Sequence, residues 1–81
     1  MVRVAIWGSL RAATGGCAEV EVEAANLREL LDRLAEAYPG IRPQIDRGVS
    51  VVIDGLVYND SWFTPVRPDS EVVLLPRIVG G

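Results

Sequence analysis

The stretch NLRELLDRLAEAY, residues 26–38, decides the fold class, because it is the long amphipathic helix around which the other segments must pack. Its apolar residues recur at i, i+3, i+4, i+7, i+8 and i+11, and they are Leu27, Leu30, Leu31, Leu34, Ala35 and Tyr38. Asn26 is a good N-cap, with Glu29 at the capping-box position. Pro39 and Gly40 then end the helix. The sequence therefore predicts one amphipathic helix with a single apolar face.

Two strands are predicted before this helix. Residues 2–7 place Val2, Val4 and Ile6 on one face, and residues 18–23 alternate strictly between apolar residues and glutamates. We expect the two strands to form an antiparallel hairpin, and Leu10 in the intervening loop to reach the core. The glutamates fit a solvated strand face better than a metal or acid–base cluster, because no neighbouring residue completes a site.

Three further strands are predicted after the helix. Residues 41–47 are interpreted as a connector whose two isoleucines close one end of the core, and residues 49–53 as the third strand. Asp54-Gly55 is a strong hairpin signal leading into a short strand at residues 56–58. Residues 64–66 are compatible with a brief helical turn, residues 68–70 with a β-turn, and residues 71–75 with the final strand.

The resulting order, two strands, one helix and three strands, predicts an α+β fold of the β-grasp (ubiquitin-like) type. In that layout one helix lies across a mixed sheet, and the last strand is central beside the first. We expect one domain over residues 1–75 and a flexible tail over residues 76–81.

Composition narrows the function. The chain has 81 residues, a net charge of −3, no histidine and no lysine, since all eight basic residues are arginines. The acidic balance argues against nucleic acid as a partner, and the lack of histidine removes His-activated nucleophiles and His-containing metal sites. No long apolar run or signal peptide is seen, so we expect a cytoplasmic protein without a membrane or metal partner. The single Cys17 is expected to be a small, partly buried filler.

The final residues form an unusual ending. The apolar strand runs into Pro76, Arg77, Ile78 and Val79 and stops on Gly80 and Gly81. Fully extended, this tail would span about 20 Å, and glycine can pass where other residues clash. It is either an incidental leftover or an arm that delivers the Gly81 carboxylate to another protein's active site.

The chain resembles the MoaD/ThiS family of ubiquitin-like sulfur carriers, and within it the small subunits of molybdopterin synthase. The resemblance rests on short motifs in the same order: Val-x-Val-x-Ile at residues 2–6, Leu10-Arg11, Thr14-Gly15, the Leu-Arg-Glu-Leu-Leu helix, and Val-Ile-Asp-Gly at residues 52–55. Thr-Pro-Val at residues 64–66, Asp-Ser-Glu-Val at residues 69–72 and Leu-Pro-x-x-x-Gly-Gly at residues 75–81 complete it. Arg77, the aromatic pair Trp62-Phe63 and Pro68-Asp69-Ser70 depart from the usual pattern.

The resemblance implies a function without catalysis by this chain. An E1-like adenylating enzyme would use ATP to activate the Gly81 carboxylate, and a sulfur donor would then displace AMP to leave a thiocarboxylate. The acceptor would be the large synthase subunit (MoaE-like), and no cofactor would be bound permanently. Alternatives are a sulfur carrier for thiamine, cysteine or thiosugar synthesis, a protein modifier joined through Gly81, and a plain interaction module.

The final strand is apolar at both parities, so apolar side chains are also expected on the face of the sheet that the helix does not cover. Tolerated surface residues would explain this. A docking patch for the partner, made by Val73, Leu75 and Trp7 and feeding into the tail at Pro76, explains it about as well. Trp62 and Phe63 are interpreted as core anchors or loop clamps more often than as partner contacts.

Overall fold

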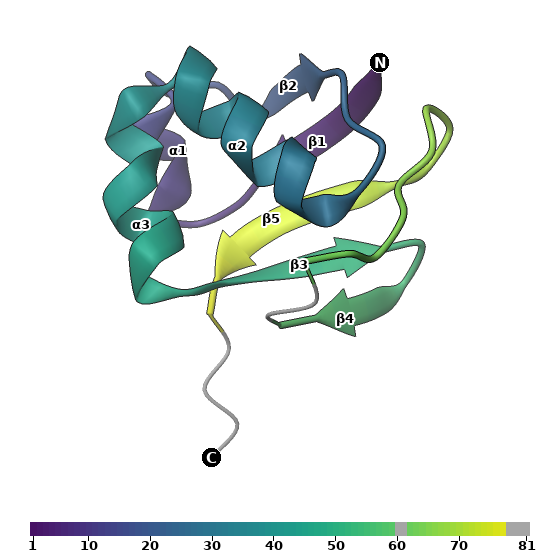
Figure 1. Ribbon diagram of the computed structural model, residues 1–81. Coiled ribbons are helices and arrows are strands. Elements are labelled where there is room, and N and C mark those ends of the chain that lie inside the picture. The colour runs from purple at the N-terminus through teal and green to yellow at the C-terminus, as the bar shows by residue number, and fades with distance from the viewer. Residues whose placement is uncertain (60–61, 78–81) are drawn as a thin grey trace.

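The computed structural model describes residues 1–59 and 62–77, which form one sheet covered on one face by helices (Figure 1). The strand order is β2-β1-β5-β3-β4. The elements are β1 (Val2–Ile6), α1 (Leu10–Ala13), β2 (Glu19–Val22), α2 (Leu27–Ala37), the 3₁₀ helix η1 (Pro39–Ile41), α3 (Arg42–Arg47), β3 (Val49–Ile53), β4 (Leu56–Tyr58) and β5 (Val72–Pro76). This is the arrangement expected from the sequence, with the last strand central beside the first.

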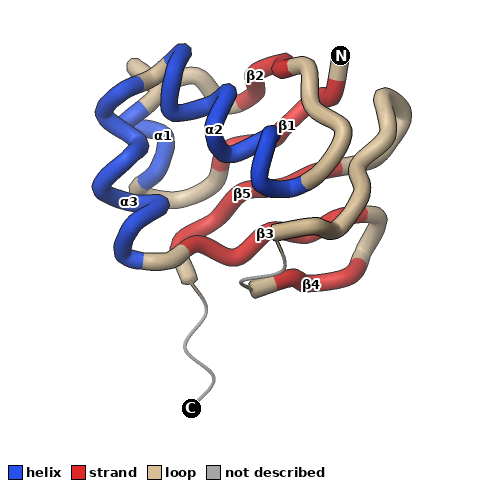
Figure 2. The backbone as a smooth tube through the Cα atoms, in the orientation of Figure 1, coloured by secondary structure: helices blue, strands red, loops and turns tan. Residues whose placement is uncertain are grey.

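Helix α2 forms as predicted and lies across the sheet (Figure 2). The Oδ1 atom of Asn26 accepts a hydrogen bond from the Glu29 amide at 2.9 Å, which satisfies one of the free N–H groups of the first turn. The Glu29 carboxylate in turn accepts from the Ala25 amide at 3.2 Å. Leu30 and Leu34 are fully buried against the sheet, so the apolar face drives the helix onto it.

The pairing of the strands places the first and last strands side by side in the centre of the sheet. β1 pairs antiparallel with β2, while β5 runs parallel to β1 and antiparallel to β3. β3 and β4 form the predicted hairpin, in which Asp54 and Gly55 have φ angles of 50° and 86°. Two positive φ angles in succession suit a tight turn between twisted strands.

One apolar core lies between the helices and the sheet. Alternate residues of β1, β2, β3 and β5 supply most of the sheet side of this core, and Tyr58 of β4 packs against its edge. Leu10 reaches the core without exposed surface, as predicted, but it does so from the short helix α1 and not from the expected loop. The opposite face of the sheet, called the open face below, carries the side chains of the intervening residues in each strand.

Residues 41–47 are not the irregular connector that the sequence suggested. They continue η1 into helix α3, where Pro43 stands in the first turn and lacks only an N–H that would have no helical partner. Ile41 and Ile45 are spaced i, i+4 on one helix face, and both are buried. The sequence of this segment is therefore that of a short helix with a proline in its first turn.

Residues 64–66 do not form the brief helical turn that their composition allowed. They extend alongside the residues before α2, with a β-bridge between Asn26 and Pro65. The Leu27 amide donates to the Thr64 carbonyl at 2.8 Å, and the Val66 amide donates to the Ala25 carbonyl at 3.0 Å. The final strand also starts and ends one residue later than predicted, at Val72 and Pro76.

Candidate functional site

The open face carries an apolar row that crosses four strands. Ala5 of β1 is opposite Val73 of β5, Val73 is opposite Val52 of β3, and Val52 is opposite Val57 of β4. Val57 is about half exposed, and the other three residues are half-buried. Because no helix covers this face, the row forms a continuous apolar strip across the sheet. This strip is called the apolar row below.

A second, shorter group lies beside the apolar row toward the end of β5. Ile6 is opposite Leu74 in the parallel pairing, and the Trp7 amide donates to the Leu74 carbonyl at 2.9 Å. Leu75 belongs to the open-face parity and is half-buried, whereas Trp7 is 53% exposed. An indole left half exposed beside aliphatic side chains is typical of a binding surface.

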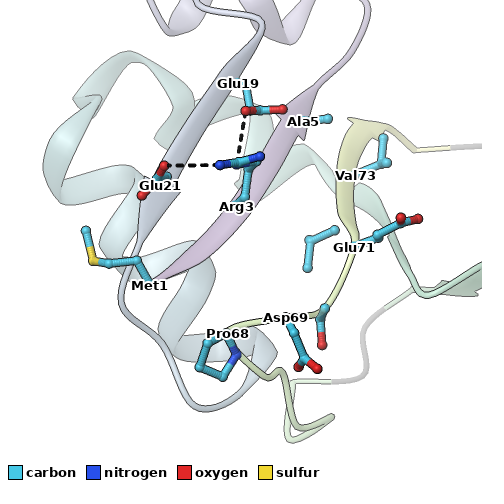
Figure 3. A pocket seen from close by; sticks show the side chains of 11 residues that line it. Met1, Arg3, Ala5, Glu19, Glu21, Pro68, Asp69, Glu71 and Val73 are labelled. Carbon is cyan, nitrogen blue, oxygen red and sulfur yellow. Dashed lines mark ion pairs between the residues drawn. The ribbon is translucent and has the colours of Figure 1, made fainter.

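The far end of the open face is polar and mostly acidic. A hollow of about 530 Å³ there is lined by Arg3, Ala5 and Val73 together with four carboxylates (Figure 3). The carboxylates belong to Glu19, Glu21, Asp69 and Glu71. Arg3 pairs with Glu19 at 3.2 Å and with Glu21 at 3.8 Å, and the four carboxylates outnumber the cations contributed by Arg3 and the N-terminus at Met1. This region is called the acidic hollow below.

The open face is thus graded along β5. Acidic residues surround the start of the strand, the apolar row crosses its middle, and Trp7 and Leu75 lie near its end, where the chain continues toward the C-terminus. A partner that docks here would approach the tail from the same face.

The predicted site residues separate into two sets. Val73, Leu75 and Trp7 lie on or beside the open face, as the docking hypothesis requires, and Pro76 and Arg77 follow as exposed residues at the end of β5. Ile78, Val79, Gly80 and Gly81 lie outside the described residues. The proposed docking and tail roles of all these residues stay predictions.

Sequence reasoning missed the extent of this surface. Strand register places Val57 in the apolar row and brings Asp69 and Glu71 to the acidic hollow. The sequence does not specify this register. The alternation of Glu19 and Glu21 was visible, and it correctly indicated a solvent-facing side of the hairpin.

Two side-chain expectations were wrong. Cys17 is exposed and is not a partly buried filler. Phe63 is 81% exposed and cannot anchor the core, whereas Trp62 is partly covered and lines a groove of about 180 Å³ on the helix side with Arg28 and Arg42. The Trp62 carbonyl accepts from the Arg28 amide at 2.9 Å, so its backbone holds the loop against α2.

Residues 1–59 and 62–77 contain no group of three or more histidine, cysteine or acidic side chains placed to hold a metal ion. Within the same ranges, every helix is too short or too polar to reach across a bilayer.

The sequence matches the ThiS family over residues 4–81. The match therefore covers nearly the whole chain and includes the two final glycines. A comparison with the sequences of curated proteins gives no match.

Several solved structures have the same fold and align over almost the full length of this chain and of their own chains. CysO of Mycobacterium tuberculosis has a TM-score of 0.81 and 24% identity, with 96% of this chain and 100% of that chain covered. The small archaeal modifier protein 1 of Methanosarcina acetivorans has a TM-score of 0.74 and 21% identity, covering 99% and 95%. A chain in the complex of subunits 1 and 2 of the Helicobacter pylori molybdopterin-converting factor has a TM-score of 0.70 and 22% identity, covering 99% and 97%.

Proposed function

The chain belongs to the ThiS family of ubiquitin-like sulfur carriers, and from this premise we propose that Gly81 is its reactive residue. The observation that carries the proposal is the family match, which extends through Gly80 to the Gly81 carboxylate. The residues of the chain agree with this assignment, because it contains no histidine or lysine that could serve as a competing catalytic group.

The chemistry needs two steps, both performed by partner enzymes. A Gly81 carboxylate oxygen attacks the α-phosphorus of ATP, which forms an acyl-adenylate and releases pyrophosphate. The terminal sulfur of a persulfide donor then attacks the acyl carbon, and AMP leaves to give an acyl disulfide. A thiol next attacks the donor-side sulfur of this disulfide, which breaks the S–S bond, releases the thiocarboxylate and leaves a new disulfide between that thiol and the donor. Adenylation is required because a carboxylate is a poor electrophile until its oxygen becomes part of a good leaving group. The carrier supplies the reactant, and the partners position it.

We assign the carrier to molybdopterin synthesis, with a large synthase subunit as the acceptor. The fold shared with a chain of the two-subunit molybdopterin-converting factor supports this assignment. The fold is shared at higher TM-scores with CysO (0.81) and with an archaeal protein modifier (0.74) than with that chain (0.70), so sulfur delivery to another pathway and conjugation through Gly81 are the alternatives that the experiment must separate.

The open face is the docking surface in this proposal. Its apolar row and Trp7 would pack against an apolar centre on the partner, and the acidic hollow would receive arginine or lysine side chains from the partner's rim. Pro76 and Arg77 would then direct residues 78–81 into the partner's active site. Val73 belongs to the apolar row and also lines the acidic hollow, whereas Leu75 lies further along the same strand, which leads into the tail.

The experiment is an intact-mass measurement after incubation with an adenylating enzyme, ATP and a sulfur donor. We expect the mass gain of one sulfur replacing one oxygen, located on the C-terminal peptide. A chain that lacks Gly81 should show no gain, and the same chain should fail to support molybdopterin formation with the large subunit. An unchanged mass of the full chain under conditions that charge a control carrier would overturn the proposal.

The alternatives predict different products. Conjugates of higher mass that disappear when Gly81 is deleted would identify a protein modifier. Thiocarboxylate formation without sulfur transfer to the pterin precursor would keep the carrier function and reject the molybdopterin assignment.

A further inference from the structure

The register of the sheet places a glycine on each side of the point where β5 ends. Ile6 is opposite Leu74 in the parallel pair, so two residues further on Gly8 comes beside Pro76. Val49 is opposite Pro76 in the antiparallel pair, so the preceding residue, Gly48, comes beside Arg77. Both neighbours of the central strand therefore reach glycine at the same level of the sheet.

The structure leaves little room for a side chain at either glycine. A Cβ atom built on Gly8 would lie 3.3 Å from Cδ and 3.4 Å from Cγ of Pro76. A Cβ atom on Gly48 would lie 3.0 Å from both Cδ and Nη1 of Arg77. Carbon atoms in favourable contact are about 3.5–4.0 Å apart, so a side chain at either position would push on Pro76 or Arg77.

Backbone conformation also favours glycine at both positions. Gly8 has a φ of 65° where β1 turns into α1, and Gly48 has a φ of 109° where α3 turns into β3. Residues with a Cβ rarely adopt these angles. The two turns lead the flanking chains away from β5 and leave its last residues between them.

We propose that Gly8 and Gly48 form a notch that sets the direction in which Pro76 and Arg77 leave the sheet. Pro76 rests against Gly8, and its ring fixes its own φ. The side chain of Arg77 lies across Gly48. The pair Pro76–Arg77 is called the tail root below, and Gly8 with Gly48 the glycine notch; the glycines are positioning residues that act through the tail root.

The notch matters because a tail that already points toward the partner loses less conformational entropy when it is bound. Residues 78–81 continue directly from Arg77, so a change in the direction of the tail root changes where the terminal carboxylate is delivered. This consequence rests on the proposed function of Gly81, whereas the notch itself does not.

The first test needs no partner enzyme. Trypsin cleaves after arginine, and it must draw Arg77 away from Gly48 before it can cut the bond to residue 78. We expect Gly8→Ala and Gly48→Ala each to raise the rate of this cleavage about threefold or more, because cleavage follows the population of the open form. The product is followed by intact mass, and cleavage at Arg28 in α2 reports on global unfolding.

The matched control is Gly15→Ala. Gly15 has a φ of 69°, close to the 65° of Gly8, and no described atom lies within 4 Å of a Cβ built there. It therefore introduces the same kind of backbone strain without touching the tail root. Cleavage after Arg77 that rises equally in Gly15→Ala, Gly8→Ala and Gly48→Ala would overturn the notch.

The second test measures adenylation by the activating enzyme. We expect Gly48→Ala to raise the KM for the carrier about threefold or more with little change in kcat, since the inserted carboxylate is the same. In the Arg77→Ala background the Gly48→Ala substitution should have little further effect, because the side chain that it displaces is absent. Equal KM values for Gly48→Ala and the Gly15→Ala control would reject the positioning role.

The two tests distinguish a failure of the proposed function of Gly81 from a failure of the glycine notch. If the unmodified chain is never adenylated, the proposed function of Gly81 falls, and the trypsin comparison alone decides whether the notch exists. If adenylation proceeds and neither test separates the notch variants from Gly15→Ala, the notch is rejected and the carrier function stands.

Discussion

At the scale of single residues, the leucines of α2 contribute most to holding the helix on the sheet. Leu30 and Leu34 have no exposed surface, and both face the core side of the strands. Removing buried methylene groups loses their transfer free energy and leaves a cavity that the surroundings fill only in part. Leu56 of β4 is also a leucine, yet 62% of its surface is exposed, so it offers a control of the same chemistry.

We predict that Leu34→Ala lowers the free energy of unfolding by about 2–5 kcal/mol. Leu56→Ala should change the same quantity by less than about 0.5 kcal/mol, as exposed positions usually do. Urea denaturation of both variants would measure the difference. Equal losses of stability would contradict the burial of Leu34 in the single core.

At the scale of the elements, the two faces of the sheet differ in what covers them. One face is covered by α1, α2 and α3, and the open face presents the apolar row with Trp7 and Leu75 at the end nearest the tail. A central strand that is apolar on both faces is explained by this division, since Val72 and Leu74 are buried in the core while Val73 and Leu75 line the open face.

We predict that Trp7→Ala raises the Kd for the partner enzyme roughly 30-fold, a loss typical of a central aromatic contact. Phe63→Ala is the control, because Phe63 is even more exposed and its loop lies on the side of α2. The stability of both variants should stay close to that of the parent chain. Calorimetric titration with the partner would test this, and a larger loss for Phe63→Ala would move the docking surface to the helix side.

At the scale of the whole molecule, charge is distributed unevenly. The chain carries a net charge of −3, and the acidic hollow gathers Glu19, Glu21, Asp69 and Glu71 around one arginine at the end of the open face away from the tail. Helix α2 carries two arginines and three carboxylates and forms ion pairs such as Arg33 to Glu36 at 3.3 Å. Exposed pairs of this kind add little stability, so the ion pairs of the acidic hollow contribute little to folding, and the proposed function gives the hollow a role in partner binding.

We predict that Glu71→Gln lowers the association rate constant with the partner about two- to fivefold at low salt and reduces its dependence on salt. Glu36→Gln on α2 removes the same charge from the covered side and should leave the rate constant nearly unchanged. Stopped-flow measurements at several salt concentrations would distinguish them. A rate constant that increases in Glu71→Gln would mean that the partner's rim is not basic.

Most of the elements could be predicted, because each is announced by a local pattern. The spacing of Leu27 to Tyr38 indicated α2, and the alternation in residues 18–23 indicated β2. Prediction of secondary structure failed for residues 41–47 and for residues 64–66. Residues 41–47 are interpreted from the sequence as a connector, yet residues 42–47 form helix α3, in which Pro43 stands in the first turn. Thr64 and Pro65 form extended backbone contacts with Ala25 to Leu27, which are distant in sequence.

The sequence by itself determined the main helix α2, the parity of each strand and the family to which the Gly-Gly ending belongs, because period and composition are properties of neighbouring residues. Tertiary structure alone decided which residues meet across strands. It placed Ala5, Val73, Val52 and Val57 in one row, and it brought Gly8 to Pro76 and Gly48 to Arg77. The physical reason is that strand register is set by packing of the whole core, and a shift of one residue would move every side chain to the other face.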